Sequence, residues 1–280
     1  MSKVIAMRRY SAAAVNISFA LLLGCSPFLA KAKAQSSGAG RQPVVIELFT
    51  SEGCSSCPPA DALLQQLEQQ QPVAGAEIIA LEEHVDYWNH DGWIDPFSSA
   101  DWTERQQDYA ALFKNDPYTP ELVVNGHSQL VGSNARKAEF EIEKAAHGVK
   151  TEIAITPGGA EATGSAEAKG SQRFTVSVGK LTPSVAGDVA EVWLAVTEDG
   201  LHSSVSLGEN AGHVLHHVAT LRSLRKIGIA DANGTSVSFT GDPIVKFKPQ
   251  WDLANLHVTV FVQEKKGREI LGAASTKIKV

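Results

Sequence analysis

The sequence predicts a chain in two parts: an α/β region at residues 42–149 and an all-β, sandwich-like region at residues 150–280. Strand-like apolar runs alternate with segments of helical periodicity as far as about His147. After Gly148 the strand-like runs follow one another, mostly separated by Gly, Pro, Asn or Asp. A chain of 280 residues is long enough for two domains of ordinary size.

Residues 1–34 have the pattern of an export signal, with basic residues first and then an apolar core at 12–23 that is too short to span a membrane. Two cleavage sites fit. Ala32-Lys33-Ala34 matches the small-x-small rule for an ordinary signal peptide. Alternatively, Leu22-Leu23-Gly24-Cys25 resembles a lipobox, in which case residues 1–24 are removed and Cys25 is lipidated. Both predict an extracytoplasmic protein, periplasmic or secreted, with a membrane link only through a lipid on Cys25.

Residues 35–41 form a predicted linker between this signal and the fold. Because Cys25 is either removed or lipidated, the folded chain keeps Cys54 and Cys57 as its thiol pair. Export favours a disulfide between them. A redox cycle of this pair needs an external electron donor or acceptor. The net charge of −6, without a basic stripe, argues against a nucleic-acid partner.

The α/β region begins with an apolar, β-branched strand at 44–49, followed by Cys54-Ser55-Ser56-Cys57 and a helix that has Pro58 and Pro59 in its first turn. Cys54 then lies just before a helix N-terminus, whose partial positive charge favours a thiolate. Asn125-Gly126 between two β-type runs predicts a hairpin. The elements expected after the first helix are a strand at 77–81, an aromatic loop at 84–97, a helix at 100–114, strands at 121–124 and 128–131, and a helix at 134–146.

The all-β region is predicted from alternation of apolar and polar residues, which is typical of half-buried strands. Residues 158–170 form a long turn of small residues. The expected strands are 151–156, 173–178, 190–197, 213–224, 236–239, 256–262 and 271–280.

The order of strand, C-x-x-C at a helix start, Thr119-Pro120 before a hairpin, and final helix resembles the thioredoxin fold. The resemblance implies an α/β thioredoxin-like domain with Cys54 as the attacking thiol and Cys57 as the resolving thiol. It also implies a cis bond before Pro120, which would lie beside the disulfide, with the backbone of Thr119 helping to hold a substrate chain.

The chain is also similar to a secreted bacterial family of this type, known only as domain-of-unknown-function family 1223. This resemblance covers nearly all of the mature chain and implies a redox pair but no substrate. Glu82-Glu83 is a departure, because less charge is expected there. The matching segments are 47–61, 84–88, 92–97, 119–120, 208–212 and 261–263.

Three residues are candidates for tuning the pKa of the cysteine pair: Glu47, His84 and Asp86. A buried Glu47 beneath the disulfide could shuttle a proton, although a capped or surface carboxylate is the simpler interpretation. His84 and Asp86 follow a strand expected to run parallel to 44–49, which brings them to the same sheet edge as Cys54. Alternatively, they brace the aromatic loop 84–97, itself either an apolar lip for a substrate or an internal latch.

These observations favour a thiol–disulfide oxidoreductase that exchanges disulfides with extracytoplasmic proteins through Cys54 and Cys57. The alternative is a non-enzymatic binding module in which the pair is a structural disulfide or a Cu(I) site, with His84 as a third ligand. We expect no cofactor and no other metal: of the nearby His213, His216 and His217, a strand would bring only two to one face.

Overall fold

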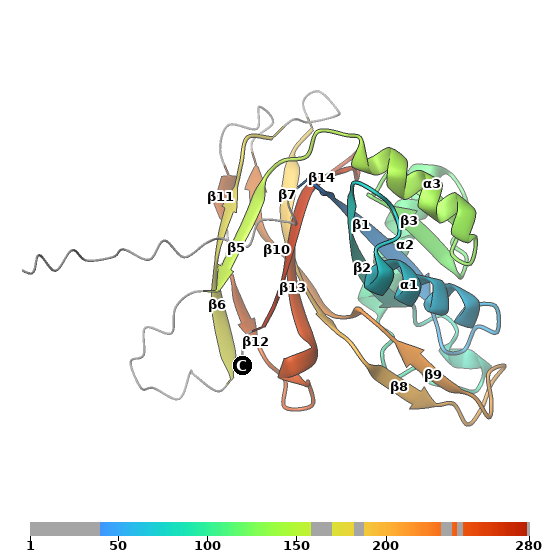
Figure 1. The fold of residues 1–280 in the computed structure, drawn as a ribbon. Helices are drawn as coiled ribbons and strands as arrows, with labels where there is room; N and C mark the ends of the chain where they lie inside the picture. The colour runs from blue at the N-terminus through green and yellow to red at the C-terminus, as the bar shows by residue number, and fades with distance from the viewer. Residues whose placement is uncertain (1–39, 158–169, 182–187, 231–236, 240–242, 279–280) are drawn as a thin grey trace, which may run out of the picture. The chain divides into compact units, whose positions relative to one another are not determined.

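The computed structural model describes residues 40–157, 170–181, 188–230, 237–239 and 243–278 (Figure 1). The predicted signal peptide, whether residues 1–34 or 1–24, lies outside the described residues, as do Cys25 and most of the linker 35–41. Among the described residues, no helix has both the length and the apolar character to cross a membrane.

A nine-stranded mixed sheet forms the framework, in the order β14-β13-β7-β10-β2-β1-β3-β4, with β11 paired to β10 (Figure 1). β1 runs parallel to β2 and antiparallel to β3, so β1 lies inside the sheet and is almost completely buried. The strands of this sheet are β1 (Gln42–Thr50), β2 (Ala76–His84), β3 (Glu121–Val124), β4 (Ser128–Val131), β7 (Ala190–Glu198), β10 (Thr220–Ala230), β11 (Val237–Phe239), β13 (Leu256–Glu264) and β14 (Ile270–Lys277).

The predicted fold class, an α/β thioredoxin-like domain followed by an all-β sandwich-like domain, is wrong. β2 pairs with β10 at Glu82 and Thr220, so strands from both predicted regions belong to one sheet, and the described chain is mostly β. A fully apolar strand pattern is the same whether its neighbours are near or distant in sequence, so the pattern could not reveal this pairing. The boundary between residues 149 and 150 stays a prediction.

A second, three-stranded sheet covers part of the first. Its strands are β5 (Ile153–Pro157), β6 (Ser171–Val178) and β12 (Ile244–Lys246). Ile155 and Phe174 of this sheet pack in one apolar core with Leu194 and Val260 of β7 and β13. A separate hairpin, β8 (Leu201–Ser204) with β9 (Val214–His217), connects β7 to β10.

The three α-helices of the described chain lie on both faces of β1, as strand alternation requires. Leu48 packs with α1 (Pro58–Gln70) and α3 (Ala135–Ala146), while Val45 on the other face packs with Trp102 of α2 (Ala100–Phe113). Trp102 also shares its core with residues of β7, β10 and β13, so α2 binds both halves of the chain together. The described residues also form two short 3-10 helices, η1 (Asn89–Asp91) and η3 (Leu253–Asn255).

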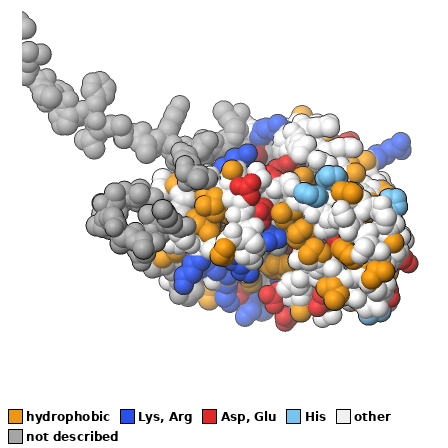
Figure 2. All heavy atoms as spheres, turned by 90° about the horizontal axis from the view of Figure 1, so that it is seen from below, with side chains coloured by type: hydrophobic (Ala, Val, Ile, Leu, Met, Phe, Trp, Pro, Cys, Tyr) orange, Lys and Arg blue, Asp and Glu red, His pale blue; other side chains and the backbone are white. Residues whose placement is uncertain are grey.

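One face of the molecule carries hydrophobic side chains in small groups among polar ones, with a group of Lys and Arg side chains at the lower left and others elsewhere on the face (Figure 2). The most exposed large apolar side chains of the described residues include Val149, Ile94 and Phe140, which lie far apart in sequence. Scattered apolar side chains of this kind are normal on a protein surface.

The predicted Asn125-Gly126 hairpin is confirmed, since β3 and β4 pair through it with φ angles of 53° and 70° at these residues. The turn packs on the connection between β13 and β14. Asn125 donates a hydrogen bond to the carbonyl oxygen of Ile270, at 2.9 Å, and a Cβ added to Gly126 would overlap the carbonyl of Arg268.

Replacing Gly126 with Ala should therefore destabilise the fold for two reasons, a positive φ and a backbone overlap. Gly75→Ala is a matched control, because Gly75 has a φ of 79° but open space where its Cβ would lie. In urea unfolding we expect Gly75→Ala to cost about 1–2 kcal/mol and Gly126→Ala to cost about 1–3 kcal/mol more. Equal losses would show that the packing of this turn contributes nothing.

Candidate functional site

Cys54 and Cys57 form a disulfide at the start of α1, with Cα atoms 5.5 Å apart. Cys57 is the N-cap residue, and Pro58 and Pro59 occupy the first helical positions as expected. The amide of Cys54 donates to the carbonyl of Ser51, at 3.1 Å, which folds the segment after β1 into a tight turn. Both cysteines are completely buried.

The Thr119–Pro120 peptide bond is cis, as the resemblance implies. A Cβ built on Gly132 would lie 3.3 Å from Cβ of Pro120 and 3.1 Å from Cβ of Ala60, so Pro120 is close to the first turn of α1. Thr119 is linked to the cysteine segment by Trp88, whose indole N–H donates to the Thr119 hydroxyl at 2.8 Å. Trp88 packs so closely on Gly53 that a Cβ at Gly53 would lie 3.0 Å from its Cβ.

A loop from the distant half of the chain binds the backbone of the cysteine segment. This covering loop, residues 205–213, connects β8 to β9. The side-chain amide of Asn210 donates to the carbonyls of Glu52 and Cys54, at 2.8 and 2.9 Å. Glu209 accepts from the amide of Ser55, at 3.0 Å. Cys54 is therefore held by residues more than 150 positions away, and sequence analysis gave Asn210 no role beyond the family resemblance.

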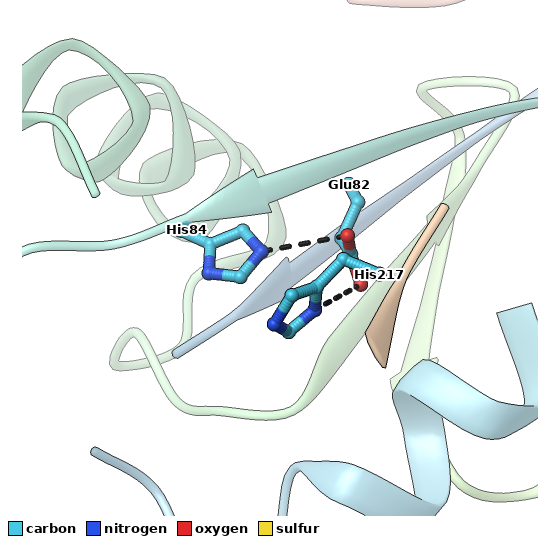
Figure 3. Close-up of side chains that lie close together, drawn as sticks. All are labelled: Glu82, His84 and His217. Carbon is cyan, nitrogen blue, oxygen red and sulfur yellow. Dashed lines mark hydrogen bonds and ion pairs between the residues drawn. The ribbon is translucent and has the colours of Figure 1, made fainter. Parts of the chain in front are cut away.

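Next to the cysteine segment lies a buried ion cluster made of Glu52, Glu82, His84, Asp95 and His217, with 2% or less of each residue exposed. His84 Nδ1 lies 2.7 Å from Asp95 Oδ2, and His217 Nε2 lies 2.9 Å from Glu52 Oε1. The other nitrogen of each ring points toward Glu82 (Figure 3). Asp95 also accepts from the backbone amide of Glu52, at 2.8 Å, which ties the cluster to the turn before Cys54.

The pKa values in this cluster follow from burial and opposite charge. Burial would lower the pKa of His217, but Glu82 and Glu52 raise it to about 9. Burial also opposes the effect of Asp95 and Glu82 on His84, whose pKa nevertheless rises well above its usual value. Burial would raise the pKa of Glu82, but the two imidazoles hold it at about 2. The cluster is therefore a network of paired charges.

Of the three proposed tuning residues, only His84 lies in this cluster. Glu47 is buried on the α2 face of β1, where it pairs with Arg105 and Tyr109. The α1 face carries Leu48, so strand alternation directs Glu47 away from the helix that Cys57 caps. Asp86 accepts from the Thr103 hydroxyl, at 2.6 Å, and thereby anchors the aromatic loop to α2.

The aromatic loop 84–97 is largely occupied with internal contacts. Trp93 donates to Glu52 at 2.8 Å, and Tyr87 donates to Gln106 at 3.1 Å. A Cβ on Gly208 of the covering loop would lie 3.3 Å from Cβ of Trp93. These contacts correspond to the latch interpretation, and they leave Ile94 as the large apolar side chain of this loop that is mainly exposed.

Fold and site together define a mostly β protein with a buried C-x-x-C disulfide at a helix start, covered by a loop from the other half of the chain. The chain belongs to the family described as protein of unknown function DUF1223, whose model matches residues 45–263. This match establishes the family and carries no statement about activity. No curated protein matches the chain.

Two solved structures share the fold. A crystal structure of an Agrobacterium tumefaciens protein is 23% identical, with a TM-score of 0.59, covering 86% of this chain and 97% of that one. HBP35 of Porphyromonas gingivalis is 17% identical, with a TM-score of 0.53, covering 86% of this chain and 77% of that one. At these identities the likeness concerns the fold alone.

Asn210→Ala should make the disulfide easier to reduce, because it removes both hydrogen bonds that hold the covering loop on Cys54. Each bond contributes about 1 kcal/mol, and reduction of a buried disulfide requires the loop to open first. We expect reduction by dithiothreitol to be about tenfold faster or more. Asn255→Ala is the control, since the Asn255 side chain bonds only to exposed Asp252 among the described residues. Unchanged kinetics in Asn210→Ala would mean that the covering loop does not limit access.

Glu121 predicts a pH dependence of stability. This residue follows Pro120 and is fully buried. Gln106 donates a hydrogen bond to Glu121 Oε2 at 2.8 Å. Burial raises the pKa of Glu121 to about 7. Between about pH 4.3, where an exposed Glu titrates, and pH 7, the folded chain keeps a proton that the unfolded chain has lost. Stability from this group is therefore present at low pH and is lost as the pH rises toward 7.

Glu121→Gln should abolish that loss, so the unfolding free energy of the variant relative to the parent should rise by about 3–4 kcal/mol between pH 4 and pH 8. Glu139→Gln, on the exposed face of α3, should show no such trend. Parallel pH profiles for Glu121→Gln and the parent protein would exclude the raised pKa.

Proposed function

We propose that the protein is a thiol–disulfide oxidoreductase that exchanges its Cys54–Cys57 bond with thiols or disulfides of extracytoplasmic proteins. The observation that carries the proposal is the position of this disulfide at the N-terminus of α1, with Pro120 close to the first turn of that helix. The partial positive charge at the N-terminus of α1 favours a thiolate on a nearby cysteine such as Cys54, and the thiolate is the form that attacks. The extracytoplasmic location is part of the proposal and is supported by the signal pattern at residues 1–34.

In the reducing direction, the Cys54 thiolate attacks a substrate disulfide, forms a mixed disulfide and releases one substrate thiol. The Cys57 thiolate then attacks the Cys54 sulfur, which closes the Cys54–Cys57 bond and releases the second substrate thiol. Two electrons pass from the protein to its substrate. An external thiol donor must reduce the pair again, and in the oxidising direction an external acceptor must reoxidise it.

Thr119 is the substrate-facing residue in this proposal. Its hydroxyl accepts from Trp88, and Trp88 packs on Gly53 next to Cys54, so Thr119 and the cysteine segment are held together. Because both sulfurs are covered, exchange requires the covering loop 205–213 to move away. Asn210 and Glu209 are the contacts that this movement would break.

The complete burial of both cysteines favours one competing function, that of a structural disulfide that fixes the start of α1. The Cu(I) alternative has less support, since His84 is directed to Asp95 and Glu82. An equilibrium titration against glutathione separates exchange from a structural role. A redox-active pair titrates in the physiological range, whereas a structural disulfide resists reduction to below about −300 mV.

Cys57→Ser tests the proposal directly, because it removes the thiol that resolves the mixed disulfide. Expressed with its signal in the native compartment, this variant should accumulate Cys54-linked adducts that dithiothreitol releases. Cys54→Ser is the matched control and should form none, since the attacking thiol is absent. Exchange is ruled out if Cys57→Ser, folded and exported, also forms no adduct.

A further inference from the structure

The buried ion cluster contains three side chains whose ligand atoms converge on one point. Glu82 and His84 lie two residues apart on β2 and so share a face of the sheet, and His217 ends β9. One ligand atom of each lies within 4.8 Å of the other two. All three are buried, with at most 2% of each residue exposed. Figure 3 shows both imidazoles directed at the Glu82 carboxylate.

From these side chains we propose a binding site for one divalent transition-metal ion, best matched by Zn²⁺, with Glu82, His84 and His217 as its ligands. The site is independent of the cysteine pair and of its proposed exchange chemistry. It also departs from the sequence-based expectation of no metal, because the sequence could not show that His217 meets the strand that carries His84.

The spacing suits tetrahedral coordination. Bonds of about 2.0–2.2 Å from Zn²⁺ to nitrogen and oxygen hold tetrahedral ligand atoms about 3.3–3.6 Å apart. His84 Nε2 lies 3.4 Å from Glu82 Oε2, and His217 Nδ1 lies 3.3 Å from the other carboxylate oxygen, Oε1. A metal bound by a single Glu82 oxygen therefore requires the carboxylate to rotate. The two imidazole rings meet edge to face with centroids 4.6 Å apart, and the three ligand atoms lie within 4.8 Å of one another.

In both rings the outer nitrogen, the one that faces away from Glu82, contacts a carboxylate, as is usual for metal-binding histidines. His84 Nδ1 contacts Asp95, and His217 Nε2 contacts Glu52. A carboxylate at the outer nitrogen keeps the N–H there and turns the lone pair of the inner nitrogen toward the metal. The outer carboxylates are themselves fixed, since Trp93 donates to Glu52 at 2.8 Å and the Phe97 amide donates to Asp95 at 2.9 Å.

A further observation concerns His84 Nε2. This nitrogen is buried and makes no hydrogen bond among the described residues, and its contact with Glu82 Oε2 is an ion pair at 3.4 Å. A buried ring nitrogen without a full hydrogen bond can bind a ligand in its place. The hydroxyl of Thr220 donates a hydrogen bond to Glu82 Oε2 at 2.9 Å and thereby orients this carboxylate.

Two imidazole nitrogens and one carboxylate oxygen are typical ligands of Zn²⁺ in sites that keep a fourth position for water or another small ligand. The same set can hold Fe²⁺ in oxygen-dependent enzymes. Thiolate does not contribute while Cys54 and Cys57 are joined, which makes a softer ion such as Cu(I) a poorer match.

The experiment uses the mature chain, oxidised and free of any histidine tag. After dialysis against a chelator, Zn²⁺ is titrated by competition with a chromophoric chelator, and bound metal is counted by mass spectrometry. We expect one Zn²⁺ per chain and a thermal midpoint that rises with Zn²⁺. His84→Gln and His217→Gln should lose this binding, whereas His216→Gln, an exposed neighbour on β9, should bind like the parent.

Asp95→Asn serves as a milder test, because it keeps all three ligands and changes only the partner of His84. It should weaken Zn²⁺ binding about 10- to 100-fold.

If the histidine variants do not fold, the site is tested with Co²⁺ bound to the parent protein. The proposal requires the visible spectrum of tetrahedral Co²⁺ without thiolate bands. The site is refuted if the parent binds no Zn²⁺ or Co²⁺, or if folded His217→Gln binds as tightly as the parent. Iron recovered in place of zinc from intact cells would keep the ligands and overturn the choice of metal.

Discussion

The structure around Cys54 depends on the need of buried charges for partners. Glu52, Glu82 and Asp95 are carboxylates without access to water, and an unpaired buried carboxylate would cost several kcal/mol. His84 and His217 supply the compensation from β2 and β9. Because these partners come from both halves of the chain, the cluster can form only when the halves are joined, and the β2–β10 pairing places Glu82 opposite Thr220 at this junction.

Glu52 connects the buried ion cluster to the cysteine segment. Its side chain is held by His217 and Trp93, its amide by Asp95, and its carbonyl by Asn210. Every polar group of a residue two positions before Cys54 is thus fixed by a distant part of the chain. The disulfide consequently lies in a turn that the covering loop holds through hydrogen bonds, and the proposed exchange would require that loop to open.

The sequence was most informative where the signal is local. The strand at β1, the helix after Cys57 and the Asn125-Gly126 hairpin all depend on neighbours within a few residues, and all are present. The sequence did not predict which distant strands pair. β2 and β10 are about 140 residues apart, and the residue pattern of neither strand identifies the other as its partner. For the same reason the sequence could not predict the buried ion cluster. Glu82 was noted only as an unexpected charge, and His217 was considered only together with its neighbours His213 and His216. The structure extends this strand to His84, so that two consecutive glutamates, Glu82 and Glu83, are buried and need partners from elsewhere.

The most direct test of this account is a double-mutant cycle between Glu52 and His217, measured by urea unfolding with a metal chelator present. Glu52→Gln, His217→Gln and the double variant isolate the coupling between the two side chains. The account predicts a coupling of about 1.5–3 kcal/mol, as expected for a buried hydrogen bond between charged groups. Losses that add to within about 0.5 kcal/mol would contradict it, because the turn before Cys54 would then not depend on the far half of the chain.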